Sequence, residues 1–270
     1  MGVALYQQNK HAEALPYLQK AHEKNPGDKE VTQLLGITHY FLGHLKEAIP
    51  LLEQVQSWFP VANVDASYVL GICYIQVRDY AKAQRAFATM FNVPPESAAA
   101  HLFLARMLLR QEFDPIADEH VQKAISLDPK IPLAHFLQGE IHLFKSRVPE
   151  AIEEFKRELE TNPSYAPAYY KLGDAYLRLL NLEEAQRNLQ RSIWLDATAS
   201  GPYVLLGKVH LKKGEAEVAT RFLQRALQMD PNNYSAHHLM GQVYRAMGKN
   251  EEADHELKLA DELQKRPNPR

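Results

Sequence analysis

Histidine is the residue type in this 270-residue sequence that most invites a metal or acid–base interpretation, because the chain contains twelve of them. A metal site needs several ligands that converge within one coordination sphere. The adjacent His237 and His238 would instead point to different sides of a helix. Six histidines, His237 among them, form two sets of three. Within each set the members are separated by about 34 residues or by a multiple of that number. We therefore expect these six to pack and to hydrogen-bond: His101, His135, His237, His39, His142 and His210.

The common catalytic motifs are absent from the sequence. It contains no His-Glu-x-x-His, paired-cysteine, Gly-x-Ser-x-Gly or glycine-rich phosphate-binding motif. Acidic neighbours such as Glu153-Glu154 are typical of solvated helix faces rather than of acid–base pairs. Cys73 is the only cysteine, so an internal disulfide is excluded and a small buried side chain is expected. The sequence predicts a protein that is not an enzyme and that holds no cofactor and no metal.

Prolines divide the chain at regular intervals. Successive members lie 34 or 35 residues apart, with one double interval in which Ala197 takes the place of a proline. The series is Pro26, Pro60, Pro95, Pro129, Pro163 and Pro231. A period in this range is typical of arrays of small supersecondary units, each too small to bury its own apolar face.

A second set of residues keeps the same period. Each unit opens with a pair such as Leu35-Gly36 or Leu172-Gly173. Twelve residues after the small residue stands an alanine: Ala48, Ala83, Ala117, Ala151, Ala185, Ala219 or Ala253. A large apolar residue follows: Leu52, Phe87, Val121, Phe155, Leu189, Phe222 or Leu257. This multi-position pattern resembles the tetratricopeptide repeat (TPR) family, and the resemblance extends from the first residues to about Gln264.

The spacing within each unit indicates two amphipathic helices, because apolar residues such as Ala48, Leu52 and Val55 lie three to four positions apart. Small residues on the facing surfaces allow the two axes to approach closely. Pairs such as Asp128-Pro129 are expected to end the second helix. Glycines with positive φ are expected at the inner turn: Gly43, Gly214 and Gly248. The predicted fold is an all-α, right-handed α-solenoid of stacked antiparallel helix hairpins.

The period also sets the boundaries of the units. One solenoid domain, 1–264, is predicted, with a partial unit at 1–28 and seven units that begin near residues 29, 64, 98, 132, 166, 200 and 234. Because Met1 falls at the seventh position of its unit, we expect a fragment of a longer protein or a misplaced start. Residues 265–270 are expected to form a disordered tail. Cytoplasmic and exported locations both stay open.

Composition excludes several other classes of protein. A hydrophobic content of 46% and a charged content of 24% are those of an ordinary soluble domain. No apolar run approaches the roughly 18 residues that a membrane span requires. The net charge is −2 and neither half of the chain is basic, so nucleic-acid binding is not expected.

A repeat array of this kind offers a surface rather than a catalytic site. The resemblance implies a concave groove, lined by the first helix of each unit, that binds extended or helical peptide segments. The groove positions of the early and middle units hold apolar side chains: Tyr40, Phe41, Tyr68, Ile72, Ile75, Phe136, Leu143 and Phe144. At least half of them could instead belong to the core. Exposed aromatic residues would mark an interface.

Other groove positions are cationic. They hold Arg106, Arg110, Arg178, Lys208, Lys212 and Arg245, with Asp174 as the opposing charge in the later units. Each of these residues, taken alone, could instead be a solvated surface charge with no role in binding. The lysine and asparagine positions of the carboxylate-binding co-chaperones are not kept here, and neither is the asparagine ladder of the sugar-transferase superhelices, so both specialisations are set aside. Trp58 and Trp194, near the ends of second helices, are interpreted as packing between repeats.

Three classes of function are consistent with these features. The first is a non-enzymatic scaffold that binds a peptide or a partner protein in the groove, with apolar anchors and acidic residues as the expected partner chemistry. The second is a regulatory or substrate-selecting module of a larger enzyme, signalling or secretion protein. The third is a self-assembly element that stacks or dimerises through a terminal repeat. The partner, the pathway and the oligomeric state stay open.

Overall fold

The computed structural model describes residues 1–58, 64–111 and 115–265 of the chain. These described residues form sixteen helices and no strand, so the predicted all-α class is confirmed. Pro60 of the proline series and residues 266–270 of the predicted tail lie outside the described residues. The chain divides into two compact units, Met1–Ala134 (unit 1) and the residues from His135 onward (unit 2).

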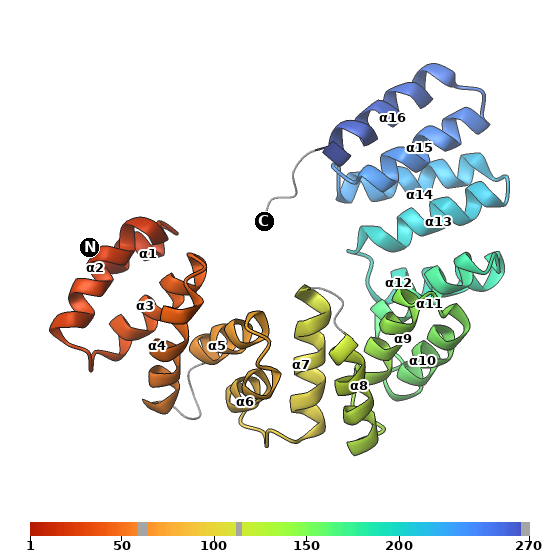
Figure 1. Ribbon diagram of the computed structural model, residues 1–270. Coiled ribbons are helices and arrows are strands. Elements are labelled where there is room, and N and C mark those ends of the chain that lie inside the picture. The colour runs from red at the N-terminus through yellow and green to blue at the C-terminus, as the bar shows by residue number, and fades with distance from the viewer. Residues whose placement is uncertain (59–63, 112–114, 266–270) are drawn as a thin grey trace. The chain divides into compact units, whose positions relative to one another are not determined.

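Unit 1 consists of helical hairpins that pack on one another in sequence order (Figure 1). Its helices are α1 (Gly2–Gln7), α2 (His11–Lys24), α3 (Lys29–Phe41), α4 (Leu45–Trp58), α5 (Val64–Gln76), α6 (Tyr80–Phe91), α7 (Ala98–Gln111) and α8 (Pro115–Leu127). The first helices of neighbouring hairpins also touch, since α1 contacts α3 and α3 contacts α5. This arrangement brings side chains from consecutive repeats onto one face.

Unit 2 repeats the same construction (Figure 1). Its helices are α9 (Ala134–Phe144), α10 (Val148–Thr161), α11 (Ala166–Arg178), α12 (Leu182–Leu195), α13 (Ser200–Lys212), α14 (Ala216–Met229), α15 (Tyr234–Ala246) and α16 (Asn250–Lys265). The first helices α11, α13 and α15 contact one another in order. The predicted tail began at Lys265, but α16 continues through that residue.

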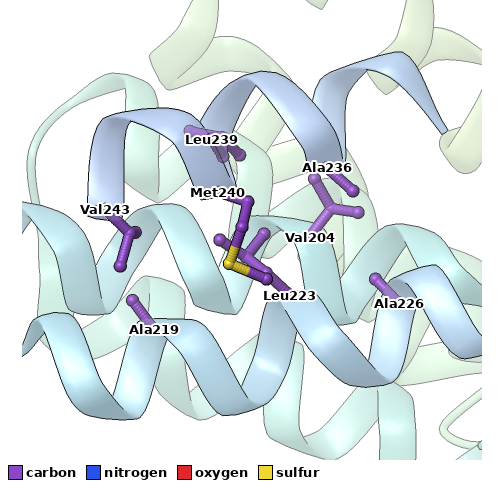
Figure 2. Packing of buried hydrophobic residues seen from close by; sticks show 8 residues of the cluster. All are labelled: Val204, Ala219, Leu223, Ala226, Ala236, Leu239, Met240 and Val243. Atoms are coloured by element: carbon purple, nitrogen blue, oxygen red, sulfur yellow. The ribbon is translucent and has the colours of Figure 1, made fainter. Parts of the chain in front are cut away.

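The periodic small and large residues form the core of each hairpin. The alanines of the series, from Ala48 to Ala253, are completely buried. Figure 2 shows one such layer, in which Leu223 of α14 and Met240 of α15 lie between alanines and valines of α13, α14 and α15. One residue of the predicted series is wrong. Leu223 occupies the buried position, whereas Phe222 lies beside it, is half-buried and stacks on His210.

The inner turns of the hairpins require a left-handed backbone. Gly43, Gly214 and Gly248 have φ of +77°, +77° and +76°, as the sequence predicts. The equivalent turns of three other repeats hold residues with side chains instead: Arg78, Ser146 and Leu180, with φ of +61°, +58° and +59°. These described turns thus share one left-handed geometry even where glycine is not used.

The first helices of six hairpins begin at Lys29, Val64, Ala98, Ala166, Ser200 and Tyr234. The first helix α9 begins at Ala134, two residues after position 132. Leu133 precedes it with φ of +75°. A side chain of the next helix supplies a cap there, since the buried Glu158 accepts a hydrogen bond of 3.3 Å from the backbone N–H of Phe136.

Candidate interaction surface

Two lysines of unit 2 form an exposed cationic pair. Lys208 and Lys212 lie four residues apart on α13, so both project from the same face of that helix. Both side chains are exposed, and the described residues offer neither of them an ion-pair partner. Since α13 contacts α11 on one side and α15 on the other, the pair lies in the middle of a face built from three first helices.

The two arginines predicted alongside them are already engaged. Arg178 of α11 donates from Nε to Oδ2 of Asp174 at 3.0 Å, and its Nη2 lies 2.9 Å from the same oxygen. Arg245 of α15 donates from Nη2 to Oδ1 of Asp254 on α16 at 3.1 Å. These carboxylates neutralise much of the positive charge of both arginines. The uncompensated charge of this face is therefore concentrated on α13.

Polar and aromatic groups lie on the two first helices that contact α13. On α15, Gln242 and His238 are both exposed and lie 2.9 Å apart from Nε2 to Nε2. On α11, the half-buried ring of Tyr170 lies against Gly201, where a β-carbon would be 3.1 Å from Cζ. Burial, and then the charge of Asp174, raise the pKa of the Tyr170 hydroxyl. Tyr170 therefore stays a neutral hydrogen-bond donor on this face.

Three aromatic side chains at predicted groove positions lie on α3 and α5 of unit 1. Phe41, at the end of α3, is 55% exposed and stacks on His11 of α2 with ring centroids 4.3 Å apart and an angle of 12° between the planes. Its neighbour Tyr40 lies 5.4 Å away, centroid to centroid. Tyr68 of α5 is 38% exposed. These side chains combine apolar area with accessibility, which is the usual character of an interface anchor.

The other predicted surface residues divide into two groups. Ile72, Ile75 and Phe136 are buried, so they are removed from the set that could contact a partner directly. Leu143 is also buried. The exposed group consists of Phe144 at the end of α9 and of Arg106 and Arg110 on α7.

The predicted packing of Trp194 between repeats is wrong. Trp194 is instead 71% exposed near the end of α12. The guanidinium carbon of Arg191 lies 4.0 Å from the centroid of its ring, and 5.9 Å from that of Tyr169. The arginine three residues earlier on the same helix was the signal that sequence reasoning missed, since it can cover a tryptophan without burying it. Trp58 is half-buried.

The polar side chains of the described chain do not converge on a metal. Within residues 1–58, 64–111 and 115–265, no group of three or more His, Cys, Asp and Glu side chains could hold an ion. The predicted histidines instead hydrogen-bond in pairs, such as His135 Nδ1 with Glu154 Oε2 at 2.6 Å. None of the helices in the described part of the chain is long and apolar enough to cross a membrane.

Comparison with known proteins gives relatives that share this architecture. Over 101 residues the chain is 29% identical to the Homo sapiens intraflagellar transport protein 88 homolog, a match that covers 36% of this chain and 12% of that protein. The structure of yeast Tom70 is similar with a TM-score of 0.62 and 14% identity, over 96% of this chain and 56% of that one. The structure of YrrB, described as a TPR protein with an unusual peptide-binding site, gives a TM-score of 0.52 at 22% identity, over 63% and 87%.

Family profiles match nearly every repeat. One profile described as tetratricopeptide repeat matches residues 5–62, 43–107 and 210–269, and a second with the same description matches 115–167 and 170–234. The matched segments cover both units, and they agree with the alanine and glycine positions that form the hairpin cores. The chain belongs to the tetratricopeptide repeat family.

Proposed function

We propose that this protein is a non-enzymatic interaction scaffold that binds an acidic peptide segment of a partner protein on the α11–α13–α15 face of unit 2. The observation that carries the proposal is the exposed pair of Lys208 and Lys212, which has no counter-charge among the described residues. Similarity to a peptide-binding TPR structure supports the same class of function.

The chemistry of the face favours carboxylates. Two lysines on one helix face attract a segment with acidic residues, and each solvent-exposed contact is worth roughly 0.2–1 kcal/mol. Charge complementarity of this kind sets the register and speeds association more than it adds affinity. The additional affinity would come from apolar anchors of the partner. Within unit 1, Phe41 and Tyr68 are exposed aromatic residues that could receive an apolar anchor of a partner.

A peptide array tests this proposal. The wild-type chain would be incubated with peptides in which acidic and aromatic positions are varied independently, and with the same peptides in scrambled order. We expect binding to follow acidic content and to weaken as salt is added. The Phe41→Ala variant should lose affinity for aromatic peptides at every salt concentration. Equal binding to acidic and basic peptides would contradict the proposal.

We propose a second function, as a regulatory or substrate-selecting TPR module of a larger enzyme, signalling or secretion protein. The observation that favours it is the extent of the matches, because the alignment covers 12% of the intraflagellar transport protein and 56% of the Tom70 chain. An antibody raised against this chain would test it in native extracts. A band well above 30.8 kDa is expected for a module, and a band at that mass would contradict this second function.

A further inference from the structure

Histidine–carboxylate pairs recur at equivalent places in unit 2. His135 of α9 pairs with Glu154 of α10, Nδ1 to Oε2, at 2.6 Å, and His237 of α15 pairs with Glu256 of α16 at 2.5 Å. In both pairs the two residues are 19 positions apart in sequence. Each pair connects the first and second helix of one hairpin, close to the start of the first helix.

The equivalent place in unit 1 holds two histidines. His101 of α7 is 19 positions before His120 of α8, and their Nδ1 atoms lie 2.7 Å apart. The rings are 5.0 Å apart from centroid to centroid. His120 thus stands where the other two hairpins have a glutamate. The His101 side chain is buried, and its Nε2 also lies 3.3 Å from Nε2 of Gln84 on α6.

A second type of pair shows the same exchange. In unit 2, His210 at the end of α13 contacts Glu215, five residues later and just before α14, with Nδ1 and Oε2 2.5 Å apart. In unit 1 the corresponding residues are His39, which is buried near the end of α3, and His44, just before α4, with their Nδ1 atoms 3.4 Å apart. Both units contain six histidines, so the units differ in partners rather than in number.

The two kinds of pair respond to protons in opposite ways. Two neutral imidazoles share one hydrogen bond, in which one Nδ1 donates and the other accepts. A proton on one ring still lets its Nδ1–H donate to the neutral ring, but protons on both rings place two donors and two positive charges together with no acceptor between them. A carboxylate accepts from a histidine in either form, and its attraction increases when the ring is charged.

The groups around the His101–His120 pair leave the pKa of both histidines lowered. Burial and then Lys123 on α8 lower the pKa of His101, although Glu96, whose Oε2 is 3.7 Å from Nε2 of His101, opposes the change. Burial and then the His101 charge lower the pKa of His120, again against Glu96. Gln84, which faces the pair from α6, carries no charge.

In the His39–His44 pair the pKa of His39 is also lowered. Burial and then His44 lower the pKa of His39, against the opposing charge of Glu47 on α4. A histidine with a lowered pKa in the folded state stabilises the fold fully above its unfolded value, near 6.5, and loses that contribution as the pH falls below it. Each such group can increase the unfolding equilibrium constant by up to about tenfold per pH unit.

We propose that unit 1 is an acid-sensitive element of this scaffold, in which protonation of the His101–His120 and His39–His44 pairs opens the α7–α8 and α3–α4 hairpins while the hairpins of unit 2 stay closed. The inference does not depend on the proposed peptide-binding face, which lies in unit 2. It gives the chain a means of changing one half of its surface when the surrounding pH falls from about 7 towards 5.

Hydrogen exchange on the full chain tests the proposal directly. Protection factors, corrected for the intrinsic pH dependence of exchange, would be measured by mass spectrometry at pH 7.5, 6.5 and 5.5. We expect protection of peptides from α7 and α8 to fall at least tenfold across this range, while peptides from α15 and α16 keep theirs. Equal loss in both units, or no loss in α7 and α8, would overturn the proposal.

Exchanging the partners gives the decisive variants. His120→Glu and His44→Glu recreate the pairs of unit 2 and should move the loss of protection in unit 1 to lower pH. Gln122→Glu is the matched control, because it adds the same charge at an exposed position of α8 and should leave the transition where it is. The reciprocal Glu256→His should introduce acid sensitivity into α15 and α16, which keeps the proposal testable if His120→Glu fails to fold. Unmoved transitions in the His→Glu variants and in Glu256→His would overturn it.

Discussion

Gly173 of α11 lies directly against Leu189 of α12. A β-carbon at Gly173 would stand 2.6 Å from Cγ of Leu189 and 3.3 Å from the carbonyl oxygen of Ala185. The same relationship joins Gly207 to Leu223 in the next hairpin, also at 2.6 Å. The glycine thus lets the two helix axes approach until the leucine of the second helix fills the space that a side chain would need.

Replacing this glycine should destabilise unit 2. For Gly173→Leu we expect a loss of about 1–3 kcal/mol, because even the first carbon of the new side chain would stand closer to Leu189 than van der Waals distance allows. Chemical denaturation monitored by circular dichroism measures the change. Gly27→Ala is the control, since a β-carbon there meets only Asn25 Oδ1, at 3.5 Å, and the stability should stay within about 0.5 kcal/mol. Equal stability of Gly173→Leu and wild type would show that the helices can separate without loss.

A substitution that increases the stability of the protein is expected at an inner turn. Leu180 is 64% exposed and has φ of +59°, a conformation that costs a residue with a side chain about 1–2 kcal/mol. Leu180→Gly should therefore increase the free energy of unfolding by about 1 kcal/mol, less the entropy that glycine adds to the unfolded chain. Thermal unfolding gives the comparison. A lower melting temperature than wild type would mean that the Leu180 side chain makes stabilising contacts that outweigh the strain.

The fold was predictable because the same spacing of small and large core residues recurs in successive repeats. Gly173, Ala185 and Leu189 are one instance of a spacing that recurs along the chain, and a single misassigned position, Phe222 in place of Leu223, does not change the result. Periodic spacing fixes which residues must face each other inside a hairpin, and so it fixes the core.

The surface was less predictable because exposure depends on the neighbouring repeat. Ile72 and Phe41 both occupy predicted groove positions, but the former is 5% exposed and the latter 55%. Similarly, the charge of Arg245 is neutralised by Asp254 on the next helix, which position within the repeat does not reveal. Packing between consecutive units, rather than the pattern inside one unit, decides which side chains remain accessible.

The lone cysteine provides a test of the packing of unit 1. Cys73 of α5 is completely buried, and burial raises the pKa of its thiol to about 11. At pH 8 only about one thiol in a thousand would be ionised. Labelling by a thiol-specific disulfide reagent should therefore be at least tenfold slower in the folded chain than in urea, and should accelerate as the pH rises towards 11. Rapid labelling of the native chain at pH 8 would contradict the closed packing around α5, with Cys73→Ala as the blank.

The measurement that tests the account most directly is the affinity of the chain for an acidic peptide selected from the array, determined as a function of salt. The double variant Lys208→Glu, Lys212→Glu should bind roughly 2- to 30-fold more weakly at low salt, with a flatter salt dependence, because two favourable charges become repulsive. The matched control Lys20→Glu, Lys24→Glu makes the same change on exposed residues four apart on α2, and should bind like wild type. If the Lys208 and Lys212 variant keeps the wild-type affinity and salt slope, the α11–α13–α15 face is not the recognition surface.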